Sequence, residues 1–332
     1  MKHTVKIILF AGLALIALFG MTACPNNAGG SGDTGGGISL PKEAVLTLSP
    51  DKLTIEVTAK TADGSAVTVV GCRDDEKTLA SGTKTTLHAQ GTTVTLKGDI
   101  IELECDNNKL TALDVRGLTA LQTLLCYYND FTELNVQGLT ALQILRSYSN
   151  RKLTALDVQG CTVLKTLMCY DSKITTLDVQ GLIALETLWC GTNQLTTLNV
   201  QGLTALQSLS CSHNNLKTLN VRGLTALQTL ECHINRKLKT LDVQGCPNLK
   251  NLQCYDNWLD DDVLTALLTD LPERRNADGA QCVLYTVRNG TGDHNHTNFT
   301  APPELKNAFD YAKNNKQWKM LKQTDWNTTS EI

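Results

Sequence analysis

The stretch LQSLSCSHNNLKTLNVRGL, residues 206–224, decides the fold because it recurs, with small changes, along half of the chain. One position marks the same place in every copy: Cys105, Cys126, Ser147, Cys169, Cys190, Cys211, Cys232 and Cys254. Successive marks lie 21, 21, 22, 21, 21, 21 and 22 residues apart. The extra residue falls in the identical string NRKL, at 150–153 and at 235–238. Self-similarity at such a period is the signature of a solenoid.

The shared pattern is L-x-x-L-x-C-x-x-N-x-L-x-x-L-[DN]-V-x-G-[LC], over residues 99–259. It resembles the leucine-rich repeat family, in particular the short-repeat type of bacterial surface lipoproteins. The resemblance implies a short parallel strand over L-x-x-L-x-C in each of eight stacked coils. The alternation in L-x-x-L-[DN]-V predicts that the opposite side of each coil is also extended. One repeat cannot bury its leucines alone, so stacking must build one continuous core.

We therefore expect a mainly β fold, with a leucine-rich repeat solenoid of parallel strands at 99–259. A β cap is expected before it at 41–98, where threonine and valine alternate. An α/β cap is expected after it at 260–332. In that cap, 260–272 and 302–321 predict two helices, and CVLYTV at 282–287 predicts a strand between them.

The N-terminus has the layout of an export signal. Lys2 and Lys6 precede the apolar run IILFAGLALIALFG at 7–20, which is too short for a lasting membrane span. MTAC at 21–24 resembles a bacterial lipobox, which implies a signal peptide at 1–23 and lipidation of Cys24. The alternative is an ordinary signal peptide cut elsewhere. We expect an exported chain, lipid-anchored to the bacterial envelope at the outer membrane or cell surface, with a glycine-rich tether at 24–40.

Charge and missing motifs narrow the function classes. The formal net charge is −3 and no basic patch stands out, so nucleic acid is not an expected partner. The sequence contains no G-x-S-x-G, H-E-x-x-H or P-loop motif. We therefore expect no enzyme activity and no cofactor.

The twelve cysteines of an exported chain could form a disulfide framework. The repeat argues against it, because in-register strands hold neighbouring Cβ atoms about 4.8 Å apart, beyond the ~3.8 Å that a disulfide prefers. We interpret the ladder cysteines as buried apolar scaffold. Redox or metal roles remain the alternative, although no C-x-x-C occurs. An asparagine three residues after most ladder positions predicts an internal amide ladder, which Ser172 interrupts.

Two other polar groups could hold a metal ion. Glu102, Glu104 and Asp106 share one strand face and could bind Ca²⁺, or could simply be solvated. His294 and His296 lie in a glycine- and asparagine-rich loop without a third ligand nearby in the sequence. We expect no metal site at either place.

The copies differ mainly at positions that should point outward, beside the inward leucine and cysteine. These positions predict the following partner-binding residues: Leu125, Tyr127, Tyr128, Arg146, Tyr148, Met168, Tyr170, Trp189, His233 and Tyr255. Tyrosine, tryptophan and arginine dominate interface hot spots. The alternative is a structural ladder in which the tyrosines stack at strand spacing.

We therefore expect a membrane-anchored, adhesin-like module that binds a protein or another cell-surface ligand of the host or of bacteria. Contact with the membrane would be through the lipid anchor only. Two alternatives stay open: a carbohydrate-binding or polysaccharide-processing protein, and an envelope spacer without a specific ligand. Paired carboxylates along the aromatic patch would favour the first alternative, and the sequence places none there.

Overall fold

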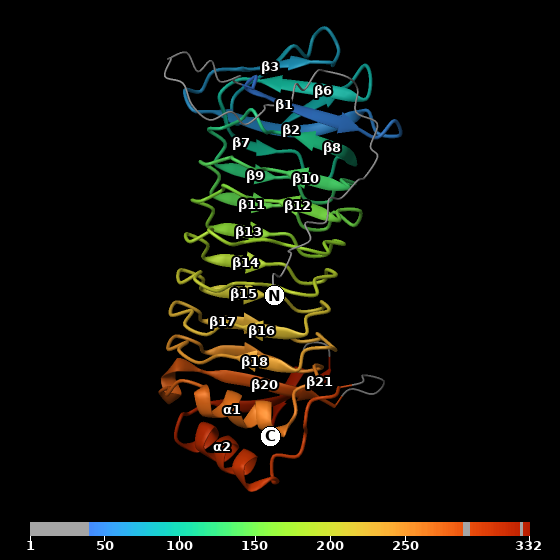
Figure 1. Cartoon of the computed structure of the whole chain (residues 1–332). Coiled ribbons are helices and arrows are strands. Elements are labelled where there is room, and N and C mark those ends of the chain that lie inside the picture. Colours follow the sequence, from blue (N-terminus) through green and yellow to red (C-terminus); the bar gives the residue numbers. More distant parts are fainter. Residues whose placement is uncertain (1–39, 288–292, 326–327) are drawn as a thin grey trace, which may run out of the picture. The chain divides into compact units, whose positions relative to one another are not determined.

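The computed structural model describes residues 40–287, 293–325 and 328–332, which wind into successive stacked coils (Figure 1). Each coil of the repeat region contributes one short strand to a shared sheet. These strands are β7 Ile100–Glu104, β9 Thr123–Leu125, β11 Ile144–Arg146, β13 Thr166–Met168, β14 Thr187–Trp189, β15 Ser208–Ser210, β17 Thr229–Glu231 and β19 Asn251–Gln253. Neighbours in this order are parallel and hydrogen-bonded, as the repeat predicted.

The register of the sheet follows from the repeat length. Leu209 of β15 lies opposite Leu188 of β14 and Leu230 of β17, and all three side chains are inaccessible to solvent. Full burial of one leucine side chain stabilises the fold by about 2 kcal/mol. A slip of one residue would turn these leucines toward solvent, so the leucines fix the register. The fold is therefore a mainly β solenoid of leucine-rich repeats, as predicted.

The ladder cysteines lie in this core as free thiols. Every ladder cysteine is buried, and Cys190 and Cys211 are fully inaccessible to solvent. Burial raises the pKa of the Cys190 thiol to about 12, and raises that of Cys211 well above its usual value. The thiols are therefore neutral at physiological pH and pack as small apolar groups. The predicted burial of these cysteines in the core is confirmed.

The asparagine ladder holds the turn that follows each strand. Asn214 is buried, and its Nδ2 donates to the carbonyls of Cys190 and Cys211 at 3.0 and 3.1 Å. Its Oδ1 accepts the Leu195 N–H at 2.9 Å. One amide thus satisfies three buried backbone groups on two coils, as the predicted ladder requires.

A second row of extended segments lies on the opposite side of the coils (Figure 1). Its strands are β8 Leu110–Asp114, β10 Glu133–Asn135, β12 Ala155–Asp157, β16 Thr218–Asn220 and β18 Thr240–Asp242. Only β10 with β12 and β16 with β18 form parallel pairs among the described coils. The opposite side is extended, as expected, but its hydrogen bonding is interrupted.

Antiparallel strands close the N-terminal end, in agreement with the predicted β cap. They are β1 Glu43–Leu48, β2 Thr54–Thr61, β3 Val67–Val70, β4 Thr78–Leu79, β5 Thr85–His88 and β6 Thr93–Lys97. Strand β2 pairs with β7, and β1 pairs with β8, so both extended sides of the first coil are covered. Covering these edges removes templates for pairing with another chain.

The C-terminal cap contains two helices, α1 Asp261–Asp270 and α2 Pro303–Asn314, which pack together. A 3₁₀ turn covers Asn276–Asp278. Strand β20 Gln281–Thr286 continues the sheet parallel to β19. Asp260 caps α1 by accepting the Val263 N–H at 3.0 Å. The predicted first helix and the strand are confirmed.

The second predicted helix was too long, because 302–321 is not helical throughout. Helix α2 ends at Asn314, and two unpredicted strands follow: β21 Lys319–Asp325 and β22 Thr328–Glu331. Between them and α2, Trp318 is buried and donates its indole N–H to the Pro272 carbonyl at 2.8 Å. Lys316 donates to the Leu271 carbonyl at 2.6 Å, beside the negative end of α1. These contacts at the end of α1 hold the chain away from a longer helix.

The predicted signal peptide, Cys24 and most of the predicted tether fall outside the described residues. Among the residues that are described, no helix has both the length and the apolar character needed to cross a bilayer.

Candidate protein-binding face

The outward side of the sheet carries two rows of variable side chains. Strand register sets Leu125, Arg146, Met168 and Trp189 side by side on β9, β11, β13 and β14. Two residues further along the chain a second row begins with tyrosines. We call the following group the aromatic face: Leu125, Tyr127, Tyr128, Arg146, Tyr148, Met168, Tyr170 and Trp189. Backbone pairing alone brings these residues onto one surface, from four coils.

Three tyrosines of the aromatic face form a stack. The rings of Tyr127 and Tyr148 lie 4.5 Å apart, and those of Tyr148 and Tyr170 lie 4.6 Å apart, each pair within 4° of parallel. These separations are close to the ~4.8 Å strand spacing, so the sheet sets the stack. Tyr128 has a positive φ of 53° and meets Tyr127 and Tyr148 edge-on at 5.8 and 5.9 Å. The tyrosines therefore form the stacked ladder that was the alternative interpretation, and the same rings also form an aromatic surface.

The tyrosine hydroxyls are neutral donors at physiological pH. Burial, and then the negative charge of Asp106, raise the pKa of Tyr127 to about 12. Burial also raises the pKa values of Tyr148 and Tyr170. Each phenol can therefore donate a hydrogen bond to a ligand while its ring supplies apolar area.

Trp189 ends the aromatic face. Its ring centroid lies 6.5 Å from that of Tyr170 at an angle of 54°, so it does not continue the stack. Its indole N–H donates to the Ser208 hydroxyl at 3.1 Å, which fixes the ring while 39% of the residue stays exposed. Gly191 follows in the second row, and a Cβ there would lie 3.1 Å from the Ser212 carbonyl. The rings therefore stop at this coil.

His233 and Tyr255 belong to a separate group. Their rings stack at 4.5 Å, and Tyr255 is only 7% exposed because Val283 and Leu321 pack against it. The prediction that Tyr255 is an outward contact residue is therefore wrong. Strands β20 and β21 extend the sheet past the last repeat, and the sequence did not indicate that they cover this ring. Ser210 and Ser212 separate this group from the aromatic face.

The acidic trio lies beside the N-terminal end of the aromatic face. Glu102 forms an ion pair with Lys60 at 2.7 Å. Glu104 and Asp106 line a cavity of about 650 Å³ together with Tyr127.

In the loop after β20, His294 stacks on Trp258 at 4.4 Å. Across the described parts of the chain, no group of three or more His, Cys, Asp or Glu side chains could hold a metal ion.

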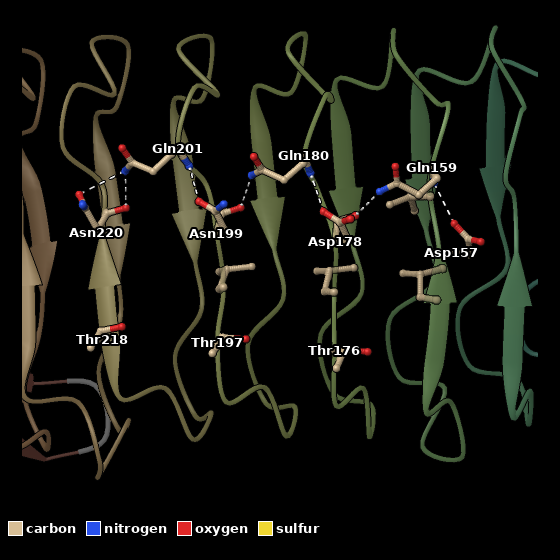
Figure 2. A pocket seen from close by; sticks show the side chains of 14 residues that line it. Asp157, Gln159, Thr176, Asp178, Gln180, Thr197, Asn199, Gln201, Thr218 and Asn220 are labelled. Carbon is tan, nitrogen blue, oxygen red and sulfur yellow. Dashed lines mark hydrogen bonds between the residues drawn. The ribbon is translucent and has the colours of Figure 1, made fainter. Parts of the chain in front are cut away.

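A groove with a volume of about 680 Å³, which the sequence analysis did not predict, lies on the opposite side of the coils (Figure 2). Its polar walls repeat from coil to coil: Asp157, Gln159, Asp178, Gln180, Asn199, Gln201 and Asn220. Figure 2 shows each glutamine reaching across to the next coil. Gln180 donates to the Asn199 carbonyl at 2.9 Å, and Gln201 to the Asn220 carbonyl at 2.8 Å. Side-chain amides therefore bridge coils that backbone bonds do not join there.

The extra residue of NRKL coincides with the closed steps of the opposite side. After each NRKL string, backbone bonds join this coil to the preceding one: Val136 N–H to Asp157 O at 3.0 Å, and Val221 N–H to Asp242 O at 3.0 Å. Gly160 comes so near that an added Cβ would lie 3.3 Å from the Gly138 Cα. The 21-residue steps between them lack this strand pairing, apart from an isolated bridge between Ala155 and Thr176, and they form the groove. One additional residue in the turn gives the chain the slack to reach its neighbour.

Comparisons with known proteins identify similar solved structures. Neither a protein-family model nor a curated protein matches the sequence. The functional domain of InlJ from Listeria monocytogenes, which includes a cysteine ladder, is 31% identical with a TM-score of 0.44, over 57% of this chain and 51% of that one. Internalin C2 from the same organism is 27% identical with a TM-score of 0.41, over 48% of this chain and 73% of that one. A leucine-rich repeat protein of Leptospira interrogans is 19% identical with a TM-score of 0.34, over 67% and 71%. The match thus spans about half of the InlJ domain's chain.

Proposed function

We propose that the chain is a protein-binding module that engages its partner through the aromatic face. The observation that carries this proposal is the run of Tyr127, Tyr148 and Tyr170 beside Trp189 on one hydrogen-bonded sheet. Contiguous exposed aromatic and apolar side chains on a folded protein mark contact surfaces. Rings of this kind supply most of the binding energy in protein interfaces.

Rigidity supports the same proposal. The tyrosine rings are held by one another, and the strands beneath them are paired on both sides. A face that is ordered before binding loses little conformational entropy on association, so more of the contact energy appears as affinity. The phenol hydroxyls add directional hydrogen bonds around the apolar rings. A flat or gently curved protein surface fits such a strand face.

We further propose that this module is displayed as an adhesin-like lipoprotein. The support is the sequence MTAC at 21–24 and the glycine-rich segment after it. Lipid on Cys24 would hold the chain at the envelope, and the tether would let the repeat region face outward. In bacteria, Cys24→Ser should move the protein from the membrane fraction to the soluble fraction and abolish labelling with a fatty acid. Unchanged labelling would contradict lipidation at this residue.

The test of binding compares the chain with a variant carrying Tyr127→Ala, Tyr148→Ala, Tyr170→Ala and Trp189→Ala. Both are applied to host cells, to bacterial cells, to matrix proteins and to glycans. We expect binding to a protein that weakens by at least about 2 kcal/mol in the variant. The matched control carries Trp258→Ala and Tyr311→Ala, two exposed aromatic residues outside the aromatic face, and should bind like the unaltered chain. Equal binding by all three proteins contradicts the proposal.

A further inference from the structure

Arg146 is the one formally charged side chain of the aromatic face, and its surroundings give it no counter-charge. It is half-buried on β11, and strand register sets Leu125 on one side and Met168 on the other. Its Nε atom is buried and has no hydrogen-bond partner in the described parts of the chain. None of the ion pairs among the described residues includes its guanidinium.

Three other arginines of the repeat region each form an ion pair, whereas Arg222 is exposed to solvent. Arg116 pairs with Asp114 at 2.7 Å, and Arg151 pairs with Asp171 at 3.2 Å. Arg236 pairs with Asp256 at 3.1 Å. In each case a carboxylate of the same or the next coil neutralises the guanidinium. The neighbouring coils offer Arg146 apolar side chains and phenols instead.

A partly desolvated cation without a counter-charge is costly unless a ligand supplies one. A guanidinium presents planar, paired N–H groups that match the two oxygens of a carboxylate. The rings of Tyr148 and Tyr170 lie next to it, and its positive charge acts on both phenols. Partial burial lowers the local dielectric constant, which strengthens a charge-assisted hydrogen bond there.

We propose that Arg146 binds an Asp or Glu carboxylate of the protein partner, seated between Leu125 and Met168 and bordered by the tyrosine stack. This inference rests on the proposed function of the aromatic face and specifies the chemistry of the partner. The partner segment carries one acidic side chain flanked by apolar or aromatic residues. The acidic side chain neutralises Arg146, the one charged residue of the aromatic face, and the flanking residues pack against the tyrosine rings.

Met168 makes the proposal measurable without knowing the partner. The chain has four methionines, of which Met168 lies beside Arg146 in the sheet and Met320 is buried in β21. The whole chain is prepared in a mild non-ionic detergent with ¹³C-methyl methionine. Its methyl resonances are followed by NMR, and the Met168 signal is assigned with Met168→Leu. Met320 serves as the internal reference for the intact fold.

The probes are two blocked tripeptides, acetyl-Tyr-Glu-Tyr-amide and acetyl-Tyr-Gln-Tyr-amide, and inorganic phosphate. We expect the glutamate peptide to shift the Met168 resonance at a concentration about tenfold lower than the glutamine peptide, which corresponds to one charge-assisted contact. The Met320 resonance should stay unchanged. In Arg146→Gln the two peptides should act alike, and Arg146→Lys should keep only part of the difference.

Three results would overturn the proposal: equal effects of the two peptides on the unaltered chain, a preference that survives in Arg146→Gln, or no Met168 shift up to the solubility limit. A stronger response to phosphate than to the glutamate peptide would assign the site to phosphate instead. Failure here is separable from failure of the proposed function. If the four-alanine variant loses its partner while the peptides act alike, the face binds protein without using this carboxylate.

Discussion

The two sides of each coil are joined to the next coil by different interactions. On the strand side, backbone bonds join every coil to the next, from β7 to β19. Outward side chains there add contacts such as the tyrosine stack, but the backbone bonds already join the coils, and within this one chain these side chains differ from coil to coil. On the opposite side the string DVQG recurs, and Gln180 and Gln201 bridge the coils. Side chains are free to diverge where the backbone supplies the cohesion, and they stay alike where they supply it themselves.

The largest expected effect is that of alkaline pH, which acts on the thiols beneath both sides. Burial raises the folded-state pKa of Cys161 and Cys246, on the opposite side, to about 11, and that of Cys190, on the strand side, to about 12. An unfolded thiol ionises near pH 8.5. Because the folded pKa is the higher one, this stability is complete below about pH 8.5 and is lost as pH rises.

Each buried thiol that ionises only on unfolding lowers the unfolding free energy by up to about 1.4 kcal/mol per pH unit above that point. We therefore expect the urea midpoint, measured under reducing conditions, to fall steeply between about pH 9 and pH 11. The variant Cys190→Ala should show a smaller decrease of the urea midpoint with pH, because one buried thiol fewer ionises on unfolding. A midpoint that stays constant across this range would contradict the neutral, buried state of the ladder.

The second largest effect compares the same substitution, Asn to Ala, on the two sides of the coil. Asn214→Ala leaves the Leu195 N–H and two carbonyls unsatisfied in the core, and we expect a loss of about 3 kcal/mol. Asn199→Ala, on the exposed opposite side, removes only an acceptor for the Gln201 N–H and should cost less than about 1 kcal/mol. Urea unfolding of both variants gives the comparison. Equal losses would mean that the amide ladder does not hold the turns.

A third, smaller effect concerns the break in the cysteine ladder. Ser147 occupies a ladder position, and its buried hydroxyl has no hydrogen-bond partner within the described residues. We expect Ser147→Cys to raise the unfolding free energy by about 1 kcal/mol, because it removes an unsatisfied polar group. Cys211→Ser should lower it by a similar amount. Thermal or urea unfolding in reductant measures both, and a change of the same sign in the two variants would contradict this explanation.

The smallest effect tests the glutamine bridges. Gln180→Ala removes the bond to the Asn199 carbonyl and should cost about 0.5 kcal/mol, because the bond is exposed to water. Gln137 stands at the same position of a closed step, and its side chain makes no hydrogen bond within the described residues. Gln137→Ala should therefore have no measurable effect. Hydrogen exchange of the amides at 178–202 would report loosening in Gln180→Ala alone.

The repeat made most of the fold predictable, since a period of 21 or 22 residues specifies coil, strand and core together. Tyr127, Tyr148 and Tyr170 could be placed on one surface because strand register follows directly from that period. Residues outside the period were harder to place. The burial of Tyr255 depends on β20 and β21, and β21 has an irregular burial pattern that gives no clear alternation.

The groove was missed for a different physical reason. The L-x-x-L-[DN]-V pattern predicted that this side is extended, but it carried no information on whether neighbouring coils pair there. Whether neighbouring coils close depends on the length of a turn far along the coil. The extra residue falls in the NRKL string that includes Arg151 and Lys152, and neither of these residues lines the groove. A local pattern cannot report a spacing that a distant turn decides.

The glutamine bridges also determine how the repeat region answers a mechanical load. Coils that touch only their neighbours act as springs in series, so every step carries the same tension. The step from β10 to β12 is stiff, because backbone bonds span it on both sides. The steps between Asp157 and Asn220 are softer on one side, where exposed glutamine amides and few backbone bonds resist opening. Under tension along the solenoid axis, we expect the spacing between the coils of Tyr127 and Tyr148 to change little. The spacing between the coils around Trp189 should increase first, so tension should alter one part of the aromatic face before the other.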